Sequence, residues 1–374
     1  MNTDQKITKI EGFALSSEYG DGKVFGQPKG KKSIGFIEVT SESGIKGFGE
    51  AYCGIYSPEL MNPIVKFLSK YIVGKSLKEL SFFDDIDMIP FIGYTGIIQG
   101  VRVGIELAVM DLIGKIEEKP VYRLFNTEDV KQKIQCYYSG GSVVFSPDLI
   151  KKDIEDLLKM GFGAYKMRVG YQTWEKDITR IDTASRLLQN NRLMVDAIMG
   201  TLKDKWTLEE ALQKTKEMES YGLYWLEEPL PRYAFDDLAK LNNSTPLRIS
   251  GGENNRNVNE FKIMLEKNSY DVLQPECMVL DGMTDMLKIA KLATFYDKTV
   301  IPHHGGWDLG QIAHLHFVAA FEHSPFLELL NDPPIAHYSH HFATFENAPV
   351  VKDGWMDVPE GPGLGIEINP DYLP

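Results

Sequence analysis

Three acidic residues stand at the ends of three short apolar segments, and their spacing allows them to meet. Asp196 ends LMVD, Glu227 ends LYWLE and Glu253 ends ISGGE, with separations of 31 and 26 residues. Acids at the ends of consecutive parallel strands share one rim, where three carboxylates repel one another unless a cation holds them. Oxygen ligands suit a hard ion, so the spacing predicts a Mg²⁺ site. The alternative is that each acid caps the helix that follows it.

Two cations lie close together in the segment AYKMRVG. Lys166 and Arg168 are two residues apart, so on a strand they point to the same side. Two neighbouring cations are costly unless they face an anion. We also expect Arg168 to lower the proton affinity of Lys166, which would make Lys166 a better base near neutral pH. The alternative is that both side chains extend into solvent from a strand edge.

A carboxylate and an imidazole follow the next two apolar segments. Glu276 follows DVLQP and His303 follows TVIP, 27 residues later. A carboxylate that hydrogen-bonds one imidazole nitrogen leaves the other nitrogen free to move protons. His304 is a rival for this role, because only one of two consecutive side chains points inward. Glu328, in the last segment FLEL, is placed to hydrogen-bond a substrate oxygen or a developing enolate. The alternative is that these are polar rim residues or helix caps.

The elements that must position these residues alternate along the chain from about residue 131. Eight short apolar runs, separated by amphipathic helical stretches, predict an α/β fold with a parallel (β/α)8 barrel over residues 131–349; they are IQCYYSG, AYKMRV, LMVDAI, LYWLEEP, LRISGGE, DVLQPE, TVIPHH and FLELL. Residues 1–50 have the pattern of antiparallel strands and 57–128 that of helices, so 1–130 is expected to form an α+β domain. The tail, 350–374, is too short for another barrel unit and is expected to pack back on that domain.

The composition restricts the partners of the chain. Its 374 residues include 40 Lys and Arg against 53 Asp and Glu, a net charge of −13, and 43% are hydrophobic. A large core is therefore available, while nucleic acids and anionic membrane surfaces are disfavoured. Cys53, Cys136 and Cys277 are far apart and odd in number, which suits a reducing cytosol. The polar start MNTDQKIT is not a signal peptide, and no apolar run is long enough to span a membrane. We predict a cytoplasmic protein.

The motifs, taken together and in this order, resemble those of the enolase superfamily, specifically its mandelate racemase and muconate lactonizing branch. They are GIELAVMDLIGK, YKMRVG, MVDA, WLEEP, GGEN, QPE, IPH, FLEL and PEGPGLGIEI, and they cover nearly the whole chain. The resemblance implies a modified (β/α)8 TIM barrel with an α+β capping domain, which is built from the N-terminal part and the C-terminal tail. It also implies removal of the proton α to a carboxylate, with the resulting enediolate stabilised on one Mg²⁺ per subunit.

The resemblance assigns roles to residues of this chain, and the chain departs from the usual pattern at three positions. It places Asp196, Glu227 and Glu253 at the metal and implies catalytic roles for Lys166, Arg168, Glu276, His303 and Glu328. Arg168 stands where a second lysine usually acts as a base, and an arginine stays protonated. Glu276 stands where Asp is usual and is one methylene longer. Ile198 replaces the Asn of the usual Asp-x-Asn motif, so a polar side chain is lost near the metal.

Several reactions remain open. A single base is sufficient for dehydration of a sugar acid to a 2-keto-3-deoxy acid, which makes a lyase the preferred prediction, with His303 as the base. A cycloisomerase acting on a sugar-acid lactone also needs only one base. A racemase or epimerase of a hydroxy acid needs a second base, which Arg168 does not supply, although Lys166 is a possible substitute. In a different class, the barrel binds an acid ligand through Mg²⁺ without turning it over.

Specificity in the resembled family is set by loops of the capping domain. The corresponding segments are residues 18–32 and 51–57, and the predicted substrate-binding residues are Tyr19, Lys23, Tyr56 and Asn254. The expected partner is a small-molecule carboxylate substrate. The resemblance also implies a homo-oligomer.

Overall fold

The N-terminal part of the chain forms an antiparallel sheet. In the computed structural model, which describes residues 5–18, 31–93, 96–125, 128–280, 282–304, 306, 308–332 and 341–374, this sheet has the order β1-β2-β3. Its strands are β1 (Ile7–Glu18), β2 (Lys31–Ser41) and β3 (Lys46–Glu50). The turn between β2 and β3 closes where the Ser41 N–H donates to the Ile45 carbonyl at 3.0 Å. Gly44 supplies the left-handed φ of 81° that this turn needs.

Helices cover this sheet and give the N-terminal domain a core of its own. They are α1 (Tyr52–Tyr56), the 3-10 turn η2 (Pro58–Leu60), α2 (Met61–Ile72), α3 (Phe82–Asp87), α4 (Gly96–Ile116) and α5 (Val121–Phe125). Buried residues such as Ile37, Leu68 and Val109 belong to one cluster within this domain. α4 lies so close to β3 that a Cβ on Gly49 would be 2.1 Å from the carbonyl oxygen of Gly104.

The eight apolar runs form the eight strands of the barrel, as predicted. They are β4 (Lys133–Ser139), β5 (Ala164–Arg168), β6 (Arg192–Asp196), β7 (Trp225–Glu227), β8 (Ile249–Gly251), β9 (Val272–Leu273), β10 (Thr299–Val300) and β11 (Phe326–Leu330). Neighbouring strands from β4 to β10 pair in parallel, and β11 pairs in parallel with β4. β10 and β11 meet through the Ser324 hydroxyl, which donates to the Val300 carbonyl at 2.6 Å.

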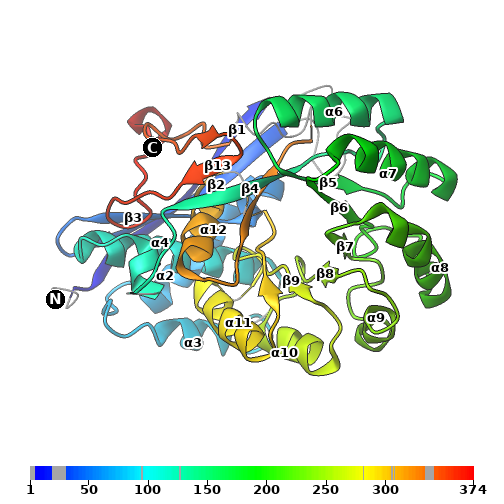
Figure 1. The fold of residues 1–374 in the computed structure, drawn as a ribbon. Coiled ribbons are helices and arrows are strands. Elements are labelled where there is room, and N and C mark those ends of the chain that lie inside the picture. The colour runs from blue at the N-terminus through cyan, green and yellow to red at the C-terminus, as the bar shows by residue number, and fades with distance from the viewer. Residues whose placement is uncertain are drawn as a thin grey trace.

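Helices alternate with the strands on the outside of the barrel. They are α6 (Pro147–Lys159), α7 (Trp174–Leu188), α8 (Leu208–Met218), with η3 (Glu219–Tyr221), α9 (Phe235–Asn242), α10 (Val258–Lys267), α11 (Met283–Phe295) and α12 (Leu309–Ala320). The described part of the chain has no α-helix after β11, which is the modification of the regular eightfold repeat. The N-terminal sheet and α4 lie on one side of the barrel, and α6 to α9 lie on the other (Figure 1).

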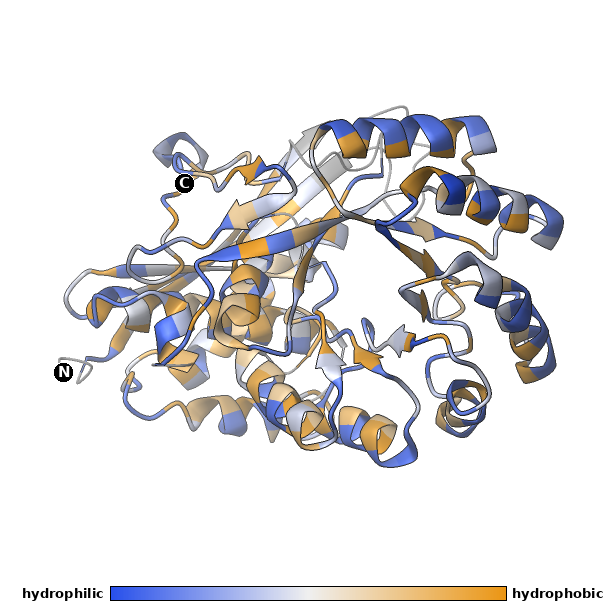
Figure 2. Cartoon of the chain, in the orientation of Figure 1, coloured by the Kyte–Doolittle hydropathy of each residue, from blue (hydrophilic) through white to orange (hydrophobic). Residues whose placement is uncertain are grey.

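The hydropathy of the outer helices follows from what covers them. Every residue of α12 is buried, because α12 packs against α5 and β3 of the N-terminal domain as well as against the barrel. In Figure 2, α12 is largely hydrophobic, whereas α6 to α8 carry long hydrophilic faces. Inside the barrel, Tyr137, Met194, Trp225 and Phe326 form a separate apolar cluster. No helix among the described residues has both the length and the apolar character that crossing a membrane requires.

The C-terminal tail joins the two parts of the molecule. β12 (Val351–Lys352) and β13 (Trp355–Asp357) form a hairpin, and β13 pairs antiparallel with β4 of the barrel. Farther on, the Leu364 N–H donates to Asp111 Oδ1 on α4 at 2.8 Å, and Gly363 accepts from the Val121 N–H at 2.8 Å. A 3-10 turn, η5 (Pro370–Tyr372), ends the chain. The tail therefore packs on the N-terminal domain, as expected, and it also extends the barrel sheet.

Candidate active site

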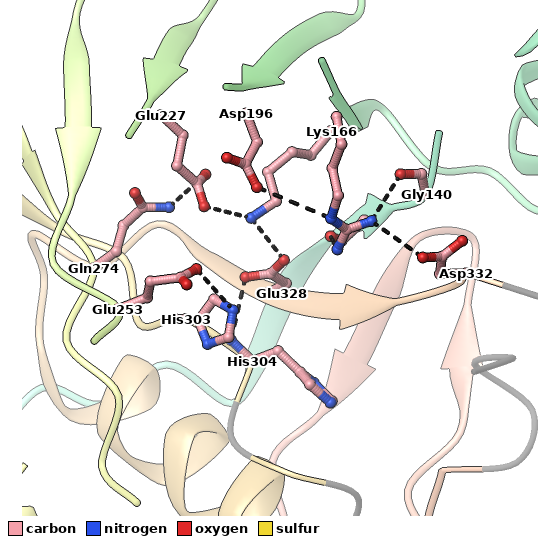
Figure 3. A network of polar contacts seen from close by, with 12 residues as sticks. Gly140, Lys166, Asp196, Glu227, Glu253, Gln274, His303, His304, Glu328 and Asp332 are labelled. Atoms are coloured by element: carbon pink, nitrogen blue, oxygen red, sulfur yellow. Dashed lines mark hydrogen bonds and ion pairs between the residues drawn. The ribbon is translucent and has the colours of Figure 1, made fainter. Parts of the chain in front are cut away.

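The eight predicted catalytic and metal-binding residues lie at one end of the barrel, at or just beyond the C-terminal ends of the strands. They are Asp196 and Glu227 at the ends of β6 and β7, Glu253, Glu276 and His303 just after β8, β9 and β10, Lys166 and Arg168 on β5, and Glu328 on β11. Figure 3 shows that the labelled side chains of this set point into one shared space. The strand spacing in the sequence thus brings these residues together.

Lys166 lies in the middle of this cluster. Its side chain is 1% exposed, and its Nζ lies 2.8 Å from Glu227 Oε1 and 2.8 Å from Glu328 Oε1. Burial alone lowers the pKa of an ammonium group, but the carboxylates of Glu227 and Glu328 outweigh burial, and the pKa of Lys166 is raised. Arg168 does lower the pKa of Lys166, as predicted, but the carboxylates outweigh it, so the prediction that Lys166 becomes a better base near neutral pH is wrong. Lys166 stays a cation.

Arg168 lies beside Lys166 and is held by its surroundings. Its Nη1 donates to the Gly140 carbonyl at 3.1 Å and lies 3.8 Å from Asp332 Oδ2, while its Nε lies 4.0 Å from Asp196 Oδ2. A guanidinium group remains charged at any physiological pH and does not accept a proton. This side of the site therefore presents two cations, Lys166 and Arg168, and neither is a base.

Glu227 is fixed in orientation by three donors. Besides Lys166 at Oε1, its Oε2 accepts from Trp225 Nε1 at 3.0 Å and from Gln274 Nε2 at 2.8 Å. Trp225 and Gln274 were missed by the sequence analysis. A signal was present, because Trp225 precedes Glu227 by two residues on one strand and Gln274 precedes Glu276 by two, and residues two apart in an extended chain point to the same side.

Asp196 is a predicted metal ligand whose charged form is disfavoured by its surroundings. Its Oδ1 accepts from the backbone N–H of Ile198 at 2.8 Å. Burial, followed by the charge of Glu227, raises the pKa of Asp196 to about 8, although Lys166 partly offsets this. Ionising Asp196 in this place is therefore costly, and a divalent cation removes that cost. The oxygen donors of Asp196, Glu227 and Glu253 fit Mg²⁺, which prefers carboxylate ligands.

The third predicted ligand, Glu253, is turned toward the imidazole. Its Oε2 lies 3.2 Å from His303 Nε2, and Figure 3 shows its carboxylate directed at the His303 ring. An octahedron with Mg–O bonds of about 2.1 Å keeps its ligand oxygens within about 4.2 Å of one another. Asp196, Glu227 and Glu253 are not among the described groups whose ligating atoms all lie within 4.8 Å. The ligand set stays a prediction, and it requires the three carboxylates to come closer together than they lie here.

A second group of potential ligands lies behind the site. Glu276, Cys277 and His314 do bring three ligating atoms within 4.8 Å. However, His314 Nε2 already accepts the backbone N–H of Cys277 at 3.0 Å. Burial, together with the charge of Glu276, raises the pKa of the Cys277 thiol well above its usual value, whereas a metal ligand must be a thiolate. This group is better explained as packing around Glu276 than as a metal centre.

Glu276 and His303 form the predicted pair. Glu276 Oε2 lies 3.1 Å from His303 Nδ1, so the longer acid does reach the imidazole. Burial lowers the pKa of His303, but the charge of Glu253 and the hydrogen bond that His303 donates to Glu276 outweigh it and raise this pKa to about 10. Burial raises the pKa of Glu276 to about 7, against the opposing effect of His303. Nδ1 is held by Glu276, and Nε2 faces the shared space of the site.

His304 points away from the site. Its Nδ1 lies 3.0 Å from Gln311 Oε1 on α12, and Figure 3 shows its ring directed away from the carboxylates. Burial lowers the pKa of His304 well below its usual value. Its backbone N–H donates to Glu328 Oε2 at 3.2 Å. Between the two rivals, the geometry favours His303 as the proton-transferring residue.

The predicted substrate-binding residues have mixed outcomes. Tyr19 and Lys23 lie outside the described residues. Tyr56 ends α1 and is 53% exposed; burial and then the charge of Glu253 raise the pKa of its phenol, which places it near the acidic rim. Asn254 donates through Nδ2 to Glu253 Oε1 at 2.6 Å, so in this structure it orients a predicted metal ligand. Their contact with substrate stays a prediction.

The raised pKa of Asp196 leads to an expected pH dependence of stability in the metal-free protein. The carboxyl changes from a pKa of 3.8 to about 8 on folding, so between these values the folded state binds more protons than the unfolded state, and stability falls as the pH rises. Asp196→Asn is expected to raise Tm at pH 9 in EDTA by about 3 °C or more, and to change it less at pH 5. The exposed Asp371→Asn is the control. An equal shift at both pH values contradicts the argument.

Ile198 is strained, and relieving it is expected to stabilise the fold. Its φ of 49° is left-handed, which is costly for a β-branched residue and which Asn tolerates. This backbone directs the Ile198 N–H at Asp196. We expect Ile198→Asn to raise the free energy of unfolding by about 1 kcal/mol, measured by urea denaturation, with Ile198→Val as the branched control. A lower free energy of unfolding for Asn than for Val would show that packing, not strain, dominates.

Known proteins are similar to this chain in sequence or in architecture. An arabinonate dehydratase of Saccharolobus solfataricus is 27% identical over 337 residues, which cover 89% of this chain and 87% of that protein. The crystal structure of a 3,6-anhydro-D-galactonate cycloisomerase from Zobellia galactanivorans superposes with a TM-score of 0.83 at 25% identity and 98% coverage of both chains. An L-talarate/galactarate dehydratase of Salmonella typhimurium, liganded with Mg and L-lyxarohydroxamate, has a TM-score of 0.85 at 23% identity, covering 99% of this chain and 92% of that one.

The family comparison covers most of the barrel. The family described as "Enolase C-terminal domain-like" matches residues 150–372, a range that includes all eight site residues and the tail. The arabinonate dehydratase and the cycloisomerase structure match over 89% and 98% of this chain. The chain is therefore a member of the enolase C-terminal domain-like family, in the mandelate racemase and muconate lactonizing branch of the enolase superfamily.

Proposed function

We propose that this protein is a Mg²⁺-dependent lyase that dehydrates a sugar acid to a 2-keto-3-deoxy acid. The observation that carries the proposal is the asymmetry of the site. One side offers an imidazole oriented by a carboxylate, with His303 Nδ1 3.1 Å from Glu276. The other side offers Lys166 and Arg168, which are held as cations by Glu227, Glu328 and Asp332. A site with one base supports elimination better than inversion at the α-carbon.

Each residue has a role in this reaction. Asp196, Glu227 and Glu253 would hold one Mg²⁺ per subunit, which supplies positive charge where the substrate carboxylate gains electron density. Lys166 and Arg168 add further positive charge on the side of the site that lies opposite the imidazole. When Mg²⁺ neutralises the charge of Glu253, the largest of the effects that raise the pKa of His303 is removed. The imidazole can then lose its proton and act as a base.

The bond changes balance with one base. His303 Nε2 takes the α-proton, and the electrons of the broken C–H bond pass into the substrate carboxylate. These electrons then form a double bond between the α- and β-carbons as the C–O bond to the β-hydroxyl breaks, and the imidazolium gives its proton to the departing oxygen, which leaves as water. The resulting enol becomes the 2-keto acid. Glu276 keeps Nδ1 of His303 occupied throughout and so directs the exchange to Nε2.

A cycloisomerase is the second candidate, and one observation favours it. The Zobellia galactanivorans structure, named for cycloisomerase activity, covers 98% of this chain with a TM-score of 0.83. That reaction class also begins with a single proton abstraction. The curated relatives named as dehydratases, including the arabinonate dehydratase and an L-rhamnonate dehydratase of Saccharopolyspora erythraea at 27% identity, favour elimination instead.

A substrate panel in D₂O tests the proposal. The protein is incubated with MgCl₂ and a set of aldonic acids, aldaric acids and sugar-acid lactones, and products are followed by NMR and by a colour assay for 2-keto acids. We expect a 2-keto-3-deoxy acid from at least one aldonate or aldarate, dependent on Mg²⁺. A ring-isomerised product without 2-keto acid would establish the cycloisomerase instead. Deuterium at the α-carbon with an inverted centre would establish a racemase. Mg²⁺-dependent binding with no exchange and no product would show a binding protein.

A further inference from the structure

Tyr52 of the N-terminal domain contacts the acid of the proton-transferring pair and the backbone of the residue after His303. It begins α1 (Tyr52–Tyr56), two residues after the end of β3. Its hydroxyl oxygen lies 3.1 Å from Glu276 Oε2 and 2.9 Å from the carbonyl oxygen of His304. Glu276 Oε2 is the same atom that contacts His303 Nδ1. Tyr52 therefore contacts the acid of the pair directly and the backbone next to the imidazole.

Glu50 binds the segment that follows His303, a few residues farther along the chain than Tyr52 does. It is the last residue of β3 and is wholly buried. Its Oε2 accepts the backbone N–H groups of Asp308 and Gly310 at 3.0 Å each. These amides open α12, where a carboxylate is stabilised by the helix dipole. The fit is close, since a Cβ on Gly306 would lie 2.7 Å from Glu50 Oε1.

The two contacts lie at two points along the segment that follows His303. Tyr52 contacts the segment at His304, and Glu50 contacts it at Asp308. Both contacts come from a domain with its own core. The position of the backbone next to His303 is therefore fixed by the N-terminal domain as well as by the barrel. The distance between His303 and Glu276 then depends on the position of the N-terminal domain on the barrel.

We propose that Tyr52 and Glu50 are positioning residues, which hold Glu276 and His303 at hydrogen-bonding distance across the domain boundary. The inference rests on the proposed function, in which His303 removes the α-proton. Small displacements at such a pair are costly, because proton transfer needs hydrogen-bonding distances. The N-terminal domain thus orients the base, in addition to any contact that it makes with substrate. Burial raises the pKa of the Tyr52 phenol well above its usual value, so its hydroxyl remains a donor.

The test uses Tyr52→Phe in the full-length protein, which removes one oxygen atom and keeps the ring. With a substrate from the panel, we expect kcat to fall about tenfold while KM changes by less than about twofold. In the substrate-free protein, the imidazole N–H proton resonance of His303, recognised by its absence in His303→Asn, is expected to shift or broaden. Tyr71→Phe, a change on α2 of the same domain, is the matched control and should change neither quantity.

The two readouts separate failure of this inference from failure of the proposed function. The N–H resonance needs no substrate, so it reports on the pair even where no acid in the panel reacts. An unchanged resonance in Tyr52→Phe overturns the inference, whether or not kcat falls, because the effect would then not act through His303. If Tyr52→Phe does not fold, Glu50→Gln takes its place: the carboxamide keeps one acceptor oxygen but loses the charge, and the same shift of the His303 resonance is expected, with no shift overturning the inference.

Discussion

His303→Asn is expected to lower kcat by about 1,000-fold and to stop exchange of the α-proton with solvent deuterium. The imidazole is the group that the proposal assigns as the base, because its Nδ1 is held by Glu276 at 3.1 Å and its Nε2 is directed at the shared space. Asn fills much of the same volume and can donate to Glu276, but it does not take up a proton. The measurement combines steady-state turnover with the deuterium content of recovered substrate by NMR.

Two further histidine variants make this result specific. His323→Asn changes an exposed residue just before β11, at the opposite end of the barrel strands, and should leave turnover unchanged. His304→Asn removes a ring that contacts Gln311 rather than the carboxylates, so it should retain α-proton exchange even if it lowers stability. Loss of exchange in His304→Asn with retention in His303→Asn would show that the neighbouring imidazole is the base.

The barrel strands and the rim could be predicted because both depend on local pattern. Each strand is a short apolar run, and the parallel order places every C-terminal end on one side. That is why Asp196 and Glu227, which are register partners on β6 and β7, were expected to be neighbours. The contact between β10 and β11 through Ser324 and the pairing of β13 with β4 were not predicted. They join segments that are far apart in the chain, and no periodicity in either segment encodes its partner.

The electrostatics of the site show the same limit. Along one strand, the pattern reveals that Lys166 and Arg168 share a side, and from that pair alone a lowered pKa of Lys166 follows. The dominant charges belong to Glu227 on β7 and Glu328 on β11, each 2.8 Å away, and their distances become known only when the barrel closes. Tyr52 lies in segment 51–57, which was predicted to set specificity, but its contact with Glu276 was not predicted, because the two residues belong to different domains and meet only through domain packing.

The expected effect of Glu253→Gln is large and reaches both the metal and the reaction. The substitution keeps the size of the side chain but replaces an anionic oxygen ligand by a neutral amide, which binds Mg²⁺ more weakly. We expect the Mg²⁺ dissociation constant, measured by calorimetry, to rise by about 100-fold and turnover to be lost at millimolar Mg²⁺. In the metal-free protein, the same change replaces the anionic partner of His303 Nε2, 3.2 Å away, by a neutral amide, so the largest effect that raises the pKa of His303 is removed as well.

These two consequences allow the metal assignment to be tested apart from folding. Glu266→Gln removes an equivalent charge from an exposed position on α10 whose ion pair with Lys262 is 3.7 Å long, and it should change neither Mg²⁺ affinity nor turnover. Glu253→Gln should still unfold at a temperature close to that of the unmodified protein in EDTA, while the stabilisation that Mg²⁺ confers on the unmodified protein is lost. Full turnover of the unmodified protein in excess chelator, or an unchanged Mg²⁺ affinity in Glu253→Gln, would remove Glu253 from the ligand set.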